Sequence, residues 1–343
     1  MKKLILWICF QFLWTTAFPQ ERPWPAAIHV QRTNLIVRWK AATHPWPKVV
    51  GIYHAVPTQF SPSVISNLTV LGSFAEKDKR AFGTNGIILG QPYSTPHLDI
   101  SFAEGKIRYD GRGQMHYSAT NLAKAVPEEN QLPEFIADFV PKLGIRQSEI
   151  AKQRNGKPRF YYTGVETGYF RQPHGGDAIS NVLSRRVVFL RDMNGGRTFM
   201  DSGRCELNFG VHGRVINIDM SWPELKCEQL YAAATQKEII RRIQQGQALQ
   251  RHMHEVLGGD EIVIDWSKVK NLTITNAEVV YFRGETFFVR EYAPQLNDPN
   301  LVYPDAELSG TVDTGSEKIR VEIVCPIIDQ TKPLNSVASE SKP

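Results

Sequence analysis

The sequence lacks the short motifs that mark the common catalytic and nucleotide-binding sites. It contains no Gly-x-Ser-x-Gly nucleophile elbow, no P-loop and no Gly-x-Gly-x-x-Gly dinucleotide fingerprint. We therefore expect neither serine-based catalysis nor a phosphate or nicotinamide cofactor. No other set of catalytic residues stands out. The prediction is a protein that is not an enzyme and binds no cofactor.

Cysteine is scarce, with four in 343 residues, and no two are spaced as Cys-x-x-Cys. A structural zinc site is therefore not expected. Three cysteines follow the N-terminal segment: Cys205, Cys227 and Cys325. In an oxidising compartment one disulfide is plausible, and Cys205 with Cys227 is the first pair to test. The alternative is three buried small apolar side chains.

Metal-binding spacing is also absent around the histidines near residue 253. His252 and His254 are two residues apart, and on a helix such side chains point about 200° from one another. A zinc protease helix instead needs two His four residues apart, with Glu after the first. We therefore expect no metal site.

The sequence has one long apolar run, and it lies at the N-terminus. Lys2 and Lys3 precede the run, and the small residues 15–17 follow it. This pattern is typical of a signal peptide, here residues 1–17, cleaved after Ala17. The run is shorter than the ~20 residues that span a bilayer, although a retained anchor is the alternative. We predict a secreted or periplasmic protein without stable membrane insertion after cleavage.

Charge and apolar content are those of a globular protein. The formal net charge is +5, the basic residues are spread among acidic ones, and 42% of the residues are hydrophobic. No basic stripe indicates nucleic acid as a partner. The length is that of about two domains.

Helix and strand patterns divide the chain into two parts. Ser61 and Gly72 bound one predicted helix, and strands at 97–102 and 106–109 form a predicted hairpin before a second helix at 133–143. Further strands are predicted at 187–192, 197–200, 205–209, 215–222, 261–266, 277–282, 285–291 and 320–325. The strongest helix spans 235–257 and opens with a capping box of Thr235 and Glu238.

These patterns predict an α+β fold of two tandem modules, each a helix packed on an antiparallel β-sheet. The predicted units are a lead-in segment with one strand (18–50), the first module (51–172), the second module (180–329) and a disordered tail (330–343).

The second module resembles known extracytoplasmic regulators. The residues that carry the resemblance are Val187-Val188-Phe189-Leu190 with Asn194-Gly195-Gly196, then Gly213-Arg214-Val215-Ile216, the helix end at 243–248, and strands at 279–281, 287–294 and 321–327. They resemble the PepSY and cystatin-like regulatory proteins of bacterial two-component systems for cell-wall control. The resemblance implies non-catalytic modules that bind proteins or inhibit peptidases.

We therefore predict an exported binding or regulatory protein of the bacterial envelope that recognises a protein partner. A sheet edge or a surface around Trp222 and the helix residues Arg241 and Arg242 is the predicted contact, because Trp and Arg are favoured interface anchors. The alternatives are a secreted hydrolase acting on cell-wall or carbohydrate material and a structural envelope protein.

Overall fold

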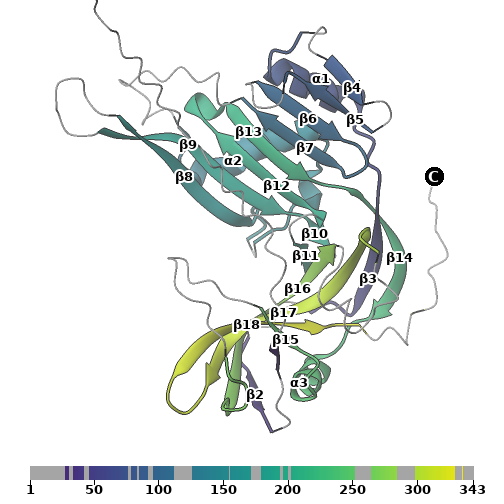
Figure 1. Ribbon diagram of the computed structural model, residues 1–343, viewed down its shortest axis with the longest axis vertical. Coiled ribbons are helices and arrows are strands. Elements are labelled where there is room, and N and C mark those ends of the chain that lie inside the picture. Colours follow the sequence, from purple (N-terminus) through teal and green to yellow (C-terminus); the bar gives the residue numbers. More distant parts are fainter. Residues whose placement is uncertain are drawn as a thin grey trace, which may run out of the picture.

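The computed structural model describes residues 28–30, 34–41, 46–75, 79–82, 85–91, 96–111, 126–153, 155–170, 179–193, 196–199, 202–251, 264–283, 298–328 and 334. Within these ranges the chain is mostly β, with three α-helices and two large sheets, one of them a half-barrel (Figure 1). The predicted signal peptide at 1–17 lies outside the described residues.

Eight antiparallel strands form the first sheet, in the order β4-β5-β6-β7-β13-β12-β9-β8. Their bounds are β4 Lys79–Phe82, β5 Gly86–Leu89, β6 His97–Ser101, β7 Lys106–Asp110, β8 Phe160–Phe170, β9 Ile179–Leu190, β12 Arg204–Phe209 and β13 Val215–Ser221. The β6–β7 and β12–β13 pairs agree with the sequence prediction.

Two helices cover one face of this sheet. Helix α1 (Pro62–Leu71) begins at Ser61, whose side chain accepts a hydrogen bond from the backbone of Val64, and it ends at Gly72, as predicted. Helix α2 (Leu132–Phe139) continues into a 3-10 turn, η5 (Val140–Leu143). Their apolar side chains form one core with every second residue of the strands, and the other strand positions face away from it.

The second sheet has ten strands, and its main path is β1-β15-β18-β17-β16-β11-β10. Strand β3 joins β14 to β17, and β2 lies parallel to β16. The bounds are β1 Ile28–His29, β2 Ile36–Trp39, β3 Val49–Val56, β10 Asp192–Met193, β11 Gly196–Thr198, β14 Glu224–Ala232, β15 Leu249–Arg251, β16 Asn271–Arg283, β17 Leu301–Asp313 and β18 Lys318–Pro326. The lead-in therefore contributes more than one strand.

Helix α3 (Gln236–Gln244) packs on the ten-stranded sheet through Ile239 and Ile243, which are fully buried. The predicted capping box of Thr235 and Glu238 is present. The predicted extension to residue 257 is wrong. Gly246 adopts φ +77°, a left-handed conformation that ends helices, and the chain continues as β15.

The prediction of two tandem helix-on-sheet modules is also wrong. The eight-stranded sheet combines β4–β8 from the first half of the chain with β9, β12 and β13 from the second. The predicted boundary between 172 and 180 falls inside the β8–β9 hairpin, whose strands pair along nearly their whole length. Each sheet is therefore assembled from both halves.

The C-terminal tail is described at one position. Leu334 donates a backbone hydrogen bond to Leu230 of β14 at 2.9 Å, and its own carbonyl accepts one from Gln229 at 2.6 Å. The predicted disorder of 330–343 therefore does not hold at Leu334. The rest of the segment lies outside the described residues.

Candidate partner-binding surface

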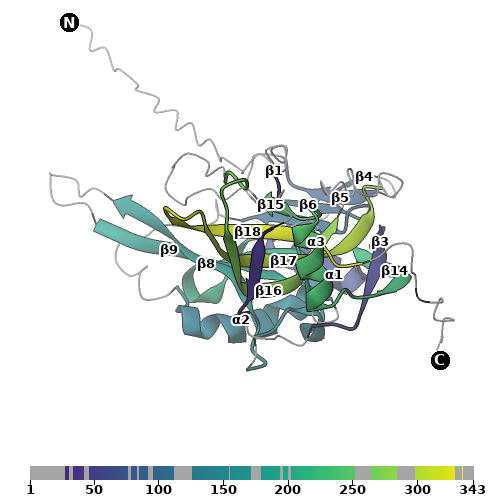
Figure 2. The ribbon, with the colours of Figure 1, turned by 90° about the horizontal axis from the view of Figure 1, so that it is seen from below.

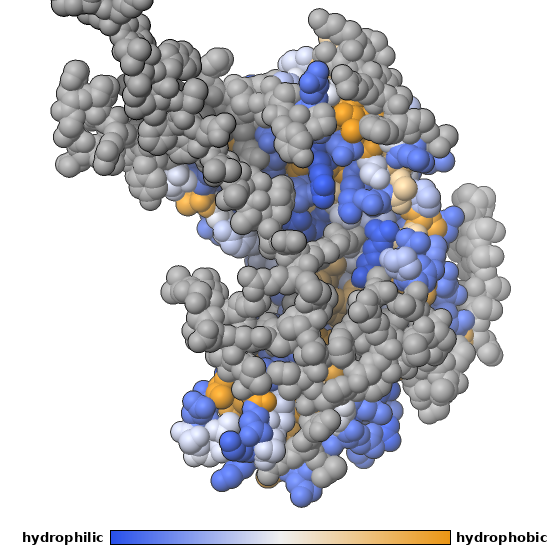
Figure 3. All heavy atoms as spheres, in the orientation of Figure 1, coloured by the Kyte–Doolittle hydropathy of each residue, from blue (hydrophilic) through white to orange (hydrophobic). Residues whose placement is uncertain are grey.

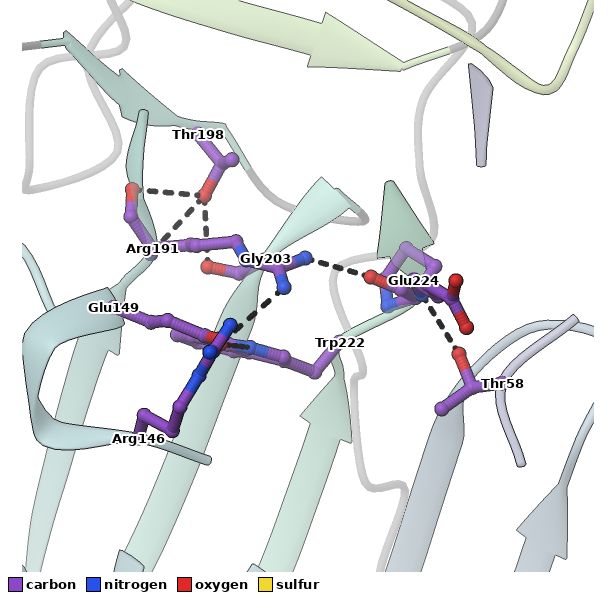
Figure 4. A network of polar contacts seen from close by, with 9 residues as sticks. Thr58, Arg146, Glu149, Arg191, Thr198, Gly203, Trp222 and Glu224 are labelled. Atoms are coloured by element: carbon purple, nitrogen blue, oxygen red, sulfur yellow. Dashed lines mark hydrogen bonds and ion pairs between the residues drawn. The ribbon is translucent and has the colours of Figure 1, made fainter. Parts of the chain in front are cut away.

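Trp222, predicted as a surface anchor, is buried where β13 leaves the eight-stranded sheet (Figure 4). It is 5% exposed. Its indole Nε1 donates to Glu149 Oε2 at 3.0 Å, and the Arg191 guanidinium lies over its ring, 5.3 Å from the centroid. These contacts leave no free face for a partner, so Trp222 is a structural residue.

Arg191 connects the two segments in which the chain passes from one sheet to the other, β9 to β10 and β13 to β14. It follows β9 of one sheet and precedes β10 of the other, and it donates to the carbonyl of Pro223, between β13 and β14, at 2.6 Å. It also pairs with Glu149 at 3.3 Å. Burial raises the pKa of Glu149, but hydrogen bonds from Trp222 and Arg146 and the charge of Arg191 outweigh it and lower this pKa.

The two predicted arginines of α3 have different environments. Arg242 Nη1 donates to the carbonyls of Pro326 at 2.5 Å and Ile328 at 3.1 Å, and so ties α3 to the chain after β18. Arg241 is exposed. Since α3 packs on the ten-stranded sheet and Trp222 in the core of the other, the three residues do not form one surface.

The structure does not form the Cys205–Cys227 disulfide, and both thiols are free. Cys205 is buried on β12, in the core between the eight-stranded sheet and its helices, whereas Cys227 is exposed on β14 of the other sheet. Cys325 is a buried free thiol. The alternative of small apolar side chains thus describes Cys205 and Cys325.

An ion-pair cluster joins the two sheets. Arg159, just before β8, makes a two-pronged contact with Glu278 of β16, at 3.0 and 2.8 Å. Arg197 of β11 reaches both Glu278, at 3.0 Å, and Glu307 of β17. Burial raises the pKa of Glu278, but the two arginines outweigh it and hold the pKa at about 2.

Asp305, on the same strand as Glu307, has the opposite character. It is 6% exposed, and burial raises its pKa to about 8 against the weaker attraction of Arg242. At neutral pH this carboxyl group is therefore mostly protonated. Burial thus keeps Asp305 uncharged, whereas the two arginines keep Glu278 ionised.

The clearest exposed feature is the outer edge of β8. In both views the β8–β9 hairpin projects beyond the rest of the described chain (Figures 1 and 2). Among the described strands β8 has a neighbour on one side only. Tyr161, Tyr162 and Val165 are 47%, 49% and 50% exposed. The described residues include few other large apolar side chains that are exposed. The edge therefore combines unpaired backbone with apolar side chains.

Other edges in the described sheets are short or charged. Strand β4, at the opposite end of the same sheet, has four residues including Lys79 and Arg80, and β1 and β10 have two residues each. Strand β14 is long but carries Glu224, Lys226 and Glu228. Short and charged edges prevent unwanted strand pairing. The eleven residues of β8 include neither Lys nor Pro.

Two irregularities divide the β8 edge. The pairing with β9 shifts between Phe160 and Tyr162 and again between Glu166 and Thr167, and the register is continuous between these points. Glu166 is the single charged residue of the strand, and its carboxylate accepts a hydrogen bond from Ser184 at 2.9 Å. The segment 162–166 is thus a regular stretch for a further strand.

Comparison with known proteins assigns no family. No protein-family model matches the chain, and no curated protein is significantly similar to it. In the part of the chain that the structure describes, no helix is long and apolar enough to cross a membrane, and no three His, Cys, Asp or Glu side chains are placed to hold a metal ion. His252 and His254 lie outside the described residues.

The sequence contained a signal for β8 that the prediction missed. Its residues, Phe-Tyr-Tyr-Thr-Gly-Val-Glu-Thr-Gly-Tyr-Phe, are rich in the aromatic and β-branched types that favour strands. The local pattern does not show that this strand lies at the edge of a sheet. That position follows from pairings far apart in the chain.

Proposed function

We propose that this is an exported, non-catalytic binding protein of the bacterial envelope that recognises a protein partner by strand addition at β8. The observation that carries the proposal is the long outer edge of β8, which lacks the protection of the other edges. An extended segment of the partner would continue the sheet through backbone hydrogen bonds, and side chains at alternate positions would give specificity.

The exposed side chains suit this mode of binding. Tyr161, Tyr162 and Val165 are aromatic or β-branched, the types that form favourable cross-strand pairs. Tyrosine is also enriched at protein interfaces, since its ring offers a large apolar area with a polar end. The envelope location rests on the N-terminal signal pattern, and the regulatory role on the resemblance of the second half to extracytoplasmic regulators.

The test is a charge placed on the edge. Val165→Lys adds the residue that natural edge strands use against pairing, at a half-exposed position where it disturbs little else. A photocrosslinking residue at position 165 identifies the partner in envelope extract. The affinity of the purified partner should then fall about tenfold or more in Val165→Lys, a loss of at least about 1.4 kcal/mol.

Val70→Lys is the matched control, because Val70 is also an exposed valine, 74% exposed on α1, away from the β8 edge. It should bind as the wild type does. Amide hydrogen exchange in 162–166 should slow on complex formation. Equal binding of the wild type and both variants, with unchanged exchange, would refute strand addition at β8.

A further inference from the structure

The face of the eight-stranded sheet opposite the helices carries a second candidate site, which shares Tyr162 with the β8 edge. The strand registers place polar residues in one straight row across five strands. The row runs, in order, through His97, Asp110, Asn217, Asn208 and Arg186. Hydrophilic residues gather over this part of the molecule in Figure 3, which has the orientation of Figure 1.

The row faces away from the core. The next residue along each strand is part of the apolar core under α1 and α2: Leu98, Tyr109, Ile218, Leu207 and Val187. Because side chains alternate between the two faces of a strand, the row lies on the helix-free face. His97, Asp110 and Asn217 are half-buried, and Arg186 is exposed, so a ligand can reach the row.

Two atoms of this row are buried without a hydrogen-bond partner in the described structure. They are Nδ1 of His97 and Oδ1 of Asn208, and Asn208 is only 7% exposed. An unsatisfied buried polar group destabilises the folded state, so such groups are rare without a reason. Three strand spacings separate the two residues, which is about 14 Å. Two unsatisfied atoms on one row indicate a ligand along it.

The far end of the row is fixed in position. Glu206 accepts a hydrogen bond from Nη2 of Arg186 and forms an ion pair with its Nε at 2.6 Å, so that Nη1 is the amino group without a partner among the described residues. The guanidinium also lies over the Tyr162 ring, 5.4 Å from its centroid. The Tyr162 side chain lies over Gly164, the residue paired with Arg186. A Cβ atom at Gly164 would lie only 2.4 Å from the Tyr162 hydroxyl. The row therefore ends in a donor beside an aromatic ring.

We propose that this row binds a neutral oligosaccharide that lies across the strands. Hydroxyl groups both donate and accept, and they match an accepting Asn208 Oδ1, a donating Arg186 Nη1 and an imidazole nitrogen. The row holds one carboxylate and one guanidinium, so a charged ligand would meet a like charge, whereas a neutral one would not. The half-exposed Tyr162 ring offers an apolar surface to the C–H face of a sugar.

The test is titration of the purified protein with chitotetraose, cellotetraose and maltotetraose, followed by calorimetry. At least one should bind with a Kd of about 1 mM or tighter, and Asn217→Ala should weaken it about tenfold. Asn67→Ala, an exposed asparagine on α1, is the matched control and should bind as the wild type does. Asn208→Ala should also lose binding.

The two proposed sites can fail separately. Val165→Lys should leave sugar binding unchanged, and Asn217→Ala should leave the protein partner's affinity unchanged. The sugar proposal is overturned if no tetrasaccharide binds at millimolar concentration, or if binding survives in both asparagine variants. It is also overturned if Asn217→Ala instead weakens the protein partner, which would assign the row to a peptide.

Discussion

An exposed ion pair of the eight-stranded sheet contrasts with a buried one between the sheets. On the helix-free face of the eight-stranded sheet, Arg108 pairs with Asp219 at 3.7 Å, and their side chains are 66% and 33% exposed, although the neighbouring Glu206 is buried and paired with Arg186 and Arg204. Between the sheets, Arg197 and Glu307 form an ion pair with side chains only 9% and 10% exposed. Removing one partner should therefore cost much more in the buried pair, where the other charge is left desolvated, than in the exposed pair.

The largest expected effect comes from breaking the buried cluster. Arg197→Met removes the shared partner of Glu278 and Glu307, and losing one side of a buried ion pair costs about 3–5 kcal/mol. Urea denaturation should show this loss of unfolding free energy. Arg197→Lys, which keeps the charge, should lose less. An unchanged midpoint in Arg197→Met would show that the cluster contributes no net stability.

Asp305→Asn should instead raise the free energy of unfolding, and the size of this gain should depend on pH. The folded state holds the Asp305 proton up to a pKa of about 8, whereas an unfolded aspartate releases it near pH 4. The wild type therefore loses stability as pH rises from about 4 to 8, and the loss is complete above pH 8. The variant lacks this loss, so its advantage in unfolding free energy should be several kcal/mol larger at pH 8.5 than at pH 4. A constant difference across that range would contradict the burial of a protonated carboxyl group.

The smallest effect is expected for the exposed ion pair of Arg108 and Asp219. Arg108→Met removes an exposed ion pair with Asp219, which contributes about 0–1 kcal/mol. Its urea midpoint should lie within that range of the wild type, under the conditions used for Arg197→Met. A loss as large as that of Arg197→Met would remove the distinction between the buried and the exposed ion pair.

Local sequence patterns predicted the elements whose signals are local. The helix start at Ser61 and the capping box at Thr235 depend on contacts three residues apart, and both are present. The end of α3 was placed too far along the chain, because Leu249 continues the helical spacing of apolar residues. In the structure Leu249 instead pairs with Val324 of β18. A distant strand thus decided the conformation of this segment.

The strand order and the candidate binding residues could not be predicted from local patterns, because they too depend on contacts far apart in the chain. Strand β17 contains Pro304 and buried Asp305 and Glu307, which do not read as a central strand, yet it pairs with β16, β18 and β3. Trp222 and Arg242 were predicted from residue type alone, and their burial and bonding depend on segments far away. The polar row at Asn208 is visible only once the strand registers are known.

Because each sheet contains strands from both halves of the chain, the order of synthesis affects how the protein folds. Strand β7 has its second neighbour in β13, and β3 pairs with β14 and with β17, of which β17 lies near the other end of the chain. The eight-stranded sheet therefore needs the chain as far as Ser221, and the ten-stranded sheet needs it as far as Pro326, and such distant pairings fold slowly. A chain that ends before β17 lacks the strand that pairs with both β16 and β3, so its ten-stranded sheet stays incomplete.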